Sequence, residues 1–110
     1  MLNSDLTLGD RAAVFAALGD VTRLGLVGRL SSGQAQSISA LAAQTLMTRQ
    51  AVTKHLKVLE RAGLTQPRRA GREQLYALRP EALAGAGDYL RQVSALWDDT
   101  LGRLKLHVEL

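Results

Sequence analysis

The sequence predicts a mainly helical domain of five helices, with one small β-hairpin between the fourth and fifth helices. Apolar residues recur every three or four positions through five segments, and the spacing changes to that of strands in one short region. The 110 residues suffice for one domain with a modest core, and an aromatic content of 4% means that Leu, Val and Ala must build that core. We therefore expect residues 1–110 to form a single domain.

The first two helices are indicated by apolar spacing and by a capping residue. Residues 8–18 have helical spacing and end before a glycine, and Asp20 is a favourable N-cap for a second helix over residues 21–30. Gly25 and Gly28 inside the second helix each cost about 1 kcal/mol relative to Ala. A close helix crossing would explain them, and local flexibility is the alternative.

Two further helices are separated by a short turn. Ser37 can cap a helix over residues 38–44, and Thr48 can cap a longer helix that ends at Gly63. Two helices joined by a turn of three to four residues, the second polar and basic on its exposed face, predict a helix-turn-helix. This motif spans residues 38–62.

The spacing changes directly after the helix-turn-helix. Residues 64–69 and 73–78 bracket a short loop that contains glycine, which predicts a two-stranded hairpin over residues 64–78. Pro67 has no N–H to donate, so its strand must lie at an edge. A hairpin that follows a helix-turn-helix in the sequence is the arrangement of a winged helix, and we call this hairpin the wing.

The last predicted helix, over residues 80–108, has an apolar stripe along its length. Four of its residues are one heptad apart and three more widen the stripe, so the helix needs a partner surface. The stripe consists of Leu83, Leu90, Val93, Trp97, Leu101, Leu104 and Val108.

Basic residues are concentrated between residues 48 and 73. This segment contains seven Lys and Arg against two Asp and Glu, whereas the rest of the chain contains seven against eight. A basic segment on an otherwise near-neutral protein is expected of a protein that binds a polyanion, because each neutralised phosphate releases counterions. A solvated charged face is the alternative.

Outward-facing side chains on the second helix of the motif are candidates for reading DNA. With Val52, Leu56 and Leu59 assigned to the core, the remaining Arg, Gln and Thr suit base edges and the Lys suit phosphates. The helix start at Thr48 favours a phosphate, and His55 can contact phosphate or pack at the helix edge. Arginines of the wing can reach the backbone or the minor groove. The predicted DNA contacts are Thr48, Arg49, Gln50, Thr53, Lys54, His55, Lys57, Arg68, Arg69 and Arg72.

Three runs of residues carry a family pattern: FAALGDVTR over residues 15–23, VTKHLKVLERAGL over 52–64, and Gly71-Arg72 with residues 76–78. They resemble the ArsR/SmtB family of repressors, and the resemblance covers nearly the whole chain. It implies a winged-helix homodimer held by the first and last helices and an operator with inverted-repeat symmetry. It also implies derepression when a signal weakens DNA binding. The interface residues that it implies are Leu8, Phe15, Leu90, Val93, Trp97, Leu101 and Leu104.

The chain departs from the metal-sensing members of that family. Where those members carry a Cys-Val-Cys motif, this sequence has Ser37, Ile38 and Ser39, and hydroxyls are poor ligands for soft metals. His107 and Glu109 are two positions apart, which places them on different faces of a helix. We expect neither a metal nor a cofactor, while a small-molecule effector of unknown identity stays open.

Several other classes of protein are disfavoured. The absence of Cys excludes disulfides and cysteine catalysis. No apolar run approaches the roughly 18 residues of a membrane span and residues 1–5 lack a basic, apolar leader, so we expect a cytoplasmic protein without membrane contact. No catalytic set has usable spacing, so we expect no enzyme activity. The leading interpretation is a sequence-specific repressor that binds double-stranded DNA; the alternatives are a protein-interaction module and a repressor gated by a metal or small molecule.

Overall fold

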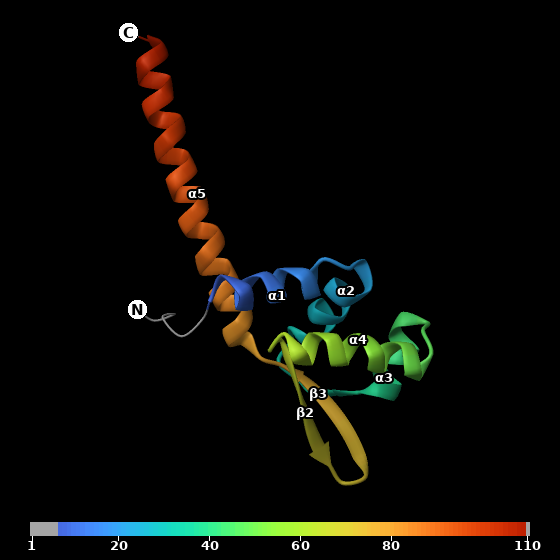
Figure 1. Ribbon diagram of the computed structural model, residues 1–110. Coiled ribbons are helices and arrows are strands. Elements are labelled where there is room, and N and C mark those ends of the chain that lie inside the picture. Colours follow the sequence, from blue (N-terminus) through green and yellow to red (C-terminus); the bar gives the residue numbers. More distant parts are fainter. Residues whose placement is uncertain (1–6, 110) are drawn as a thin grey trace.

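The computed structural model describes residues 7–109, which form five helices and a small antiparallel sheet (Figure 1). Residues 1–6 and 110 and the side chains of Val108 and Glu109 lie outside the described part, and so does the expected lack of a leader in residues 1–5. The elements are α1 (Leu8–Leu18), α2 (Val21–Leu30), β1 (Gln36–Ser37), α3 (Ile38–Thr45), α4 (Arg49–Arg61), β2 (Thr65–Ala70), β3 (Glu73–Leu78) and α5 (Pro80–Glu109).

The helix boundaries follow from local capping chemistry. The side chains of Asp20, Ser37 and Thr48, the three predicted N-caps, each accept a hydrogen bond from the backbone amide three residues later, at 3.0, 3.0 and 3.1 Å. At the other end of α4, Gly63 has a φ of +83° and its amide donates to the carbonyl of Glu60 at 2.9 Å. This left-handed cap ends α4 where the sequence predicts.

The core lies between the helices and the sheet, and α4 provides its centre. Val52, Leu56 and Leu59 on α4 are all 0% exposed, which confirms their assignment to the core. Tyr76 on β3 is also 0% exposed, and its hydroxyl is buried without a hydrogen-bond partner in the described part of the chain. The hairpin position of Tyr76 in the sequence predicts a hydroxyl near solvent or DNA, and this prediction was wrong. The reason is that Tyr76 belongs to the hydrophobic core, where β3 packs against α2 and α3.

The sheet has three strands in the order β1-β3-β2, so the predicted two-stranded wing is incomplete. The additional strand, β1, is two residues long and becomes a strand only by pairing with β3. The other two strands pair from Thr65 opposite Leu78 to Ala70 opposite Glu73. As the sequence predicts, the strand that contains Pro67 lies at an edge of the sheet.

Helix α5 is 30 residues long and leaves the body of the protein after its first turns (Figure 1). Near its start, the Tyr89 ring lies 6.2 Å from the Phe15 ring on α1, measured between centroids. From Leu90 to His107 every side chain is exposed. The molecule is consequently elongated, with extents of 68 × 31 × 22 Å. Despite its length, neither α5 nor any other helix within residues 7–109 has the apolar character needed to cross a bilayer.

Gly25 and Gly28 lie on the exposed side of α2, and no atom lies within 4 Å of the position that a Cβ would occupy at either residue. No close helix crossing within the described chain therefore requires these glycines. We expect Gly28→Ala to raise the free energy of unfolding by about 0.5–1 kcal/mol, because alanine loses less backbone entropy in a helix. Urea unfolding followed by circular dichroism measures this change.

The matched control for that prediction is Gly63→Ala. Because Gly63 has a φ of +83°, its replacement should lower the free energy of unfolding by about 1–2 kcal/mol. Opposite signs for the two alanine variants are expected, and destabilisation by both would contradict the assignment of Gly28 to an open helix face.

Candidate nucleic-acid interface

Helices α3 and α4 form the helix-turn-helix, and a left-handed residue makes the turn between them. Leu46 has a φ of 58° and a ψ of 29°, and its side chain is 94% exposed. Few residues other than glycine adopt this conformation, and it reverses the chain within a short turn. Thr48 then starts α4 in a new direction, with its hydroxyl bound to the amide of Ala51.

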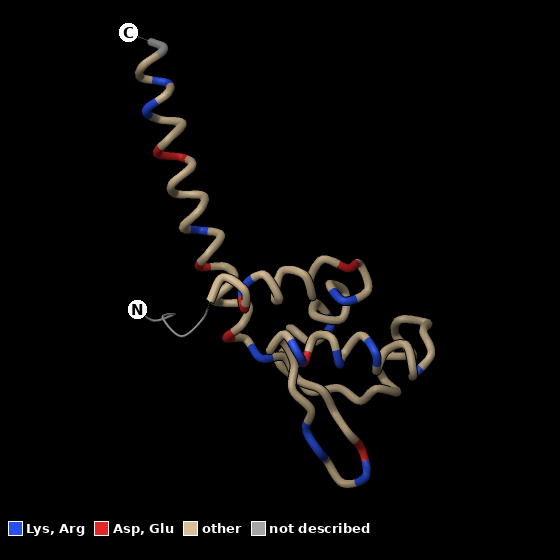
Figure 2. The backbone as a smooth tube through the Cα atoms, viewed as in Figure 1, with Lys and Arg blue, Asp and Glu red and all other residues tan. Residues whose placement is uncertain are grey.

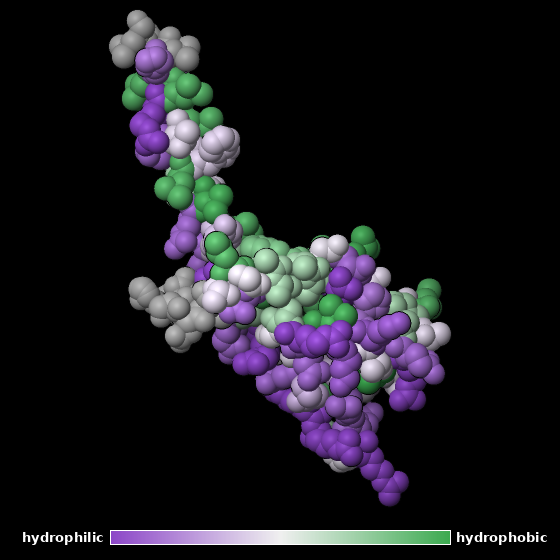
Figure 3. Space-filling view, in the orientation of Figure 1, coloured by the Kyte–Doolittle hydropathy of each residue, from purple (hydrophilic) through white to green (hydrophobic). Residues whose placement is uncertain are grey.

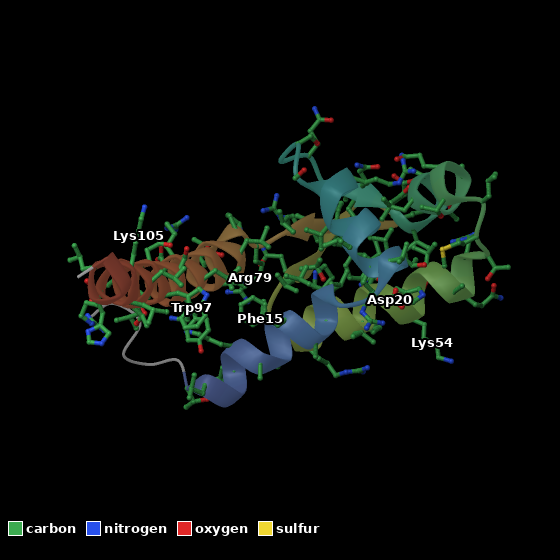
Figure 4. The ribbon with its side chains drawn as sticks, turned by 90° about the horizontal axis from the view of Figure 1, so that it is seen from above. Phe15, Asp20, Lys54, Arg79, Trp97 and Lys105 are labelled. Carbon is green, nitrogen blue, oxygen red and sulfur yellow. The ribbon has the colours of Figure 1, made fainter. Side chains whose placement is uncertain are left out.

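The amino-terminal half of α4 presents most of its predicted DNA contacts to solvent. A groove of about 700 Å³ is lined by α4 residues and by one residue of α3. Thr53 is half-buried, and its hydroxyl donates to the carbonyl of Arg49 at 2.8 Å, which leaves its methyl group and oxygen lone pairs for another contact. Figure 4 shows Lys54 pointing away from the body. The groove is lined by Ile38, Arg49, Gln50, Thr53 and Lys54.

Two residues near the exposed face of α4, one on α3 and one on α4, have a different setting. Ile38, at the start of α3, is half-buried and packs against the core, and it also lines the groove beside α4. Its position beside α4 depends on the turn geometry, which periodicity does not reveal. Lys57 is 50% exposed, and its Nζ lies 3.9 Å from Oε1 of Glu60. An exposed pair at this distance is weak and leaves Lys57 available to a phosphate.

His55 packs toward the start of α2. Its Nδ1 lies 4.0 Å from Oδ2 of Asp20 and 3.5 Å from Nη1 of Arg23, and its side chain is 26% exposed. Arg23 also donates through Nε to the carbonyl of Ala17 at 2.7 Å, so this cluster joins the α1–α2 corner to α4. Of the two roles considered for His55, packing at the helix edge is the one that these contacts favour.

The same cluster keeps the α2 cap charged. The backbone amide of Arg23 donates to Asp20 and lowers the pKa of that carboxyl, and the charges of Arg23 and His55 lower it further. Because the pKa is lowered on folding, the cap stabilises the protein at neutral pH, and this contribution is lost as the pH falls through the lowered value.

The wing places its arginines on more than one side. Arg68 pairs with Leu75 and Arg69 with Gln74, so the two adjacent side chains point to opposite faces of the hairpin, while Arg72 lies in the loop. All three arginines are exposed. Figure 2 shows basic residues along both α4 and the hairpin, and Figure 3 shows hydrophilic surface running from α4 to the tip of the wing.

The residues predicted for the dimer interface form two groups. Leu8 is 70% exposed at the start of α1, and the five residues on α5 are between 44% and 63% exposed. Phe15, by contrast, is half-buried against Tyr89 of its own chain. Two further leucines on α5, Leu96 and Leu106, are 69% and 64% exposed and were not predicted, because they lie off the heptad positions. The five α5 residues are Leu90, Val93, Trp97, Leu101 and Leu104.

No group of three or more His, Cys, Asp or Glu side chains that could hold a metal ion occurs among the residues that the structure describes. His107, one of the side chains considered as a ligand, is exposed on α5, and the side chain of Glu109 lies outside the described part. The polar surface of α4 and the wing is therefore the best-defined candidate for a functional site.

Comparison with known proteins agrees with this arrangement. Residues 18–67 match the family model described as a helix-turn-helix domain. The chain is 36% identical over 81 residues to the uncharacterized HTH-type transcriptional regulator YuzN of Bacillus subtilis, covering 68% of this chain and 88% of the relative.

Two solved structures are similar to nearly the whole fold. An ArsR-like transcriptional regulator from Rhodococcus sp. RHA1 has a TM-score of 0.83 and 36% identity, covering 94% of this chain and 97% of that one. The second is the homodimeric winged helix-turn-helix DNA-binding domain of Mb0332 from Mycobacterium bovis, a possible ArsR-family regulator. It has a TM-score of 0.63 and 28% identity, covering 86% of this chain and 83% of that one. The fold, the exposed helix-turn-helix and these relatives together show that the chain belongs to the ArsR family of DNA-binding helix-turn-helix transcriptional regulators.

Proposed function

We propose that the protein is a repressor that binds an inverted-repeat operator as a homodimer, with α4 in the major groove and the wing on the adjacent backbone or minor groove. The observation that carries this proposal is the exposed face of α4, where Arg49, Gln50 and Lys54 line one groove next to an arginine-bearing hairpin. A major groove about 12 Å wide accepts one helix, and its base edges offer the partners that these side chains need.

Each side chain has a role that follows from its chemistry and position. Arg49 and Gln50 lie in the first turn of α4, where they suit bidentate contacts to guanine and to adenine. Thr53 lies one turn further on and suits a thymine methyl group. Lys54 and Lys57 act on phosphates, and the amides at Thr48 add the positive end of the helix dipole.

The apolar stripe of α5 supports a two-fold assembly. A second copy of the chain has the same apolar stripe, and packing the two stripes against each other buries both of them, as in an isologous interface. The Mycobacterium bovis relative is described as homodimeric. A two-fold dimer presents two copies of α4, which matches an operator with two half-sites about one helical turn of DNA apart. Repression then follows from occupation of DNA that the transcription machinery needs.

Selection from random DNA followed by fluorescence anisotropy tests this proposal. We expect selection to enrich an inverted repeat, and the full chain to bind it at least about a thousandfold more tightly than a scrambled duplex at the same salt concentration. Affinity should fall steeply with added salt because phosphate contacts release counterions. Equal affinity for both duplexes would refute sequence-specific binding. Transcription in vitro from a promoter that overlaps the selected repeat separates repression from activation.

We expect Gln50→Ala to weaken binding to the selected operator by about 1–3 kcal/mol and to relax selectivity at one base pair in each half-site. Arg72→Ala is the matched control, because an arginine in the wing loop should weaken binding to operator and scrambled duplexes by similar factors. Anisotropy with operators changed at single positions measures both effects. The same loss of selectivity in both variants would contradict the separate roles of α4 and the wing.

A further inference from the structure

A cavity of about 390 Å³ lies where α1, the end of α4 and the start of α5 meet. It is separate from the groove assigned to DNA. Three of its lining residues are arginines, and each comes from a different part of the chain: Arg11 from α1, Arg61 from the end of α4 and Arg79 from the residue before α5. Figure 4 shows Arg79 where α5 joins the body. Folding thus places three arginines that are distant in sequence along the wall of one cavity.

Arg11 is buried, and no carboxylate within the described part of the chain pairs with it. It is 8% exposed and is the one charged residue buried within the described part of the chain. Its Nη1 donates to the carbonyl of Gly85, and its guanidinium carbon lies 5.8 Å from the centroid of the Tyr89 ring. None of the three arginines forms an ion pair with a carboxylate of residues 7–107. A buried charge is costly unless it is paired, and among the described residues Arg11 makes one hydrogen bond, to Gly85, although its guanidinium group has five N–H donors.

The start of α5 also lines the cavity. Arg79 occupies the position before the first helical residue, and a guanidinium has no acceptor atom with which to cap the first-turn amides. Glu81 and Ala82 of this first turn line the cavity. Amides at a helix start favour an anionic group, and Glu81 in this first turn is one such group, so the arginines and not the helix end select an anionic ligand.

The charge balance and the walls define the ligand further. Besides the three arginines, two carboxylates line the cavity, those of Asp10 and Glu81, so one positive charge is uncompensated. Asp10 is already held by the Thr7 amide at 3.1 Å. Val14 and Ala86, which are 8% and 6% exposed, provide an apolar floor. The volume accommodates about a dozen groups the size of a water molecule.

We propose that this cavity is a binding site for a small organic monoanion, a carboxylic acid with an apolar or aromatic body. The carboxylate lies among the guanidinium groups of Arg11, Arg61 and Arg79, and the apolar body lies on Val14 and Ala86. Guanidinium groups bind carboxylates through paired, charge-assisted hydrogen bonds, which a neutral ligand of the same shape cannot form equally well.

The position of the cavity couples such a ligand to DNA binding, a step that rests on the proposed function. The ligand contacts the last residue of α4 and the first turn of α5, which are the helices assigned to the operator and to the dimer. It also neutralises Arg61, one of the cations of the basic segment. We therefore expect the bound acid to weaken operator binding, and the operator to weaken binding of the acid by the same factor.

Amide NMR titrations of the full chain with benzoate and phenylacetate test the site without DNA. We expect saturable shifts confined to residues 10–14, 61–63 and 79–86, with benzamide and phenylacetamide binding at least about tenfold more weakly. The substitutions Arg61→Gln and Arg79→Gln change exposed residues, and each should weaken the binding of benzoate about tenfold. The control Arg29→Gln, on the exposed surface of α2, should leave the affinity for benzoate unchanged. The site is refuted if neither acid gives saturable shifts, if the amides bind equally well, or if both cavity variants keep full affinity.

Anisotropy with the selected operator tests the coupling separately. Saturating benzoate should weaken operator binding at least fivefold in the wild-type chain. In the Arg79→Gln variant, the operator affinity should be the same with and without benzoate. Binding of benzoate with unchanged operator affinity would overturn the coupling and leave the site intact. Binding of benzoate by a chain that fails to select any DNA sequence would overturn the proposed function instead.

Discussion

Leu101→Glu should convert the dimer to a monomer. Leu101 is 47% exposed in the middle of the α5 stripe, and a two-fold interface buries it twice. Losing two buried leucine side chains weakens association by about 3–6 kcal/mol, which is about a hundredfold to ten-thousandfold in the dissociation constant. Two carboxylates brought into one interface add to this loss. Sedimentation equilibrium measures the mass, for which one chain is 11.9 kDa.

The matched control for this change is Leu106→Glu. Leu106 is on the same helix and is 64% exposed, but it follows Leu101 by five residues, which turns its side chain by about 140° from Leu101 and away from the stripe. This control should stay dimeric. Dissociation by both variants to the same extent would show that added charge on α5, and not loss of the stripe, causes the effect.

Dissociation should also weaken operator binding strongly. A monomer reaches one half-site, so it gives up the contacts of the second copy of α4 and of the second wing. We expect Leu101→Glu to bind an isolated half-site and the full operator with the same weak affinity, whereas Leu106→Glu prefers the full operator. Full operator affinity in a chain shown to be monomeric would contradict the two-fold arrangement.

Most of the helices were predictable because the signals that define them are local. Asp20, Ser37 and Thr48 act on amides three residues away, and Gly63 ends α4 through its own backbone conformation. The α4 core residues follow from a spacing within one helix. Such features depend on neighbours in sequence, so a single chain without relatives is sufficient to find them.

The features that the sequence did not predict depend on contacts between distant residues. β1 is a strand because it pairs with β3, about 40 positions further along the chain, and its two residues have no strand period of their own. Tyr76 is buried because β3 packs against α2 and α3, so its hydroxyl does not lie near solvent or DNA as its hairpin position predicts. His55 lies toward Asp20 because α2 crosses beside α4. The cavity at Arg11 likewise unites residues from three separate elements.

Substitutions at Leu56 and Lys57 separate the folding role of α4 from its DNA-binding role. Leu56→Ala should lower the free energy of unfolding by about 2–5 kcal/mol, because Leu56 is 0% exposed and its removal leaves a cavity in the centre of the core. Its carbonyl also accepts a hydrogen bond from the Thr65 hydroxyl at 3.4 Å, which ties α4 to β2. Urea unfolding at a fixed protein concentration measures the change, since dissociation of a dimer contributes to its stability.

Lys57→Ala, at the next position of the same helix, should give the opposite profile. Its side chain is 50% exposed and its ion pair with Glu60 is weak, so the free energy of unfolding should change by no more than about 0.5 kcal/mol. Operator affinity should nevertheless fall, and the slope of affinity against salt should decrease by about one per half-site. Folded Leu56→Ala protein should instead retain the wild-type salt slope. If Lys57→Ala destabilised the fold as much as Leu56→Ala, α4 would not divide into a buried face and a DNA-binding face, and the case for DNA reading by α4 would fail.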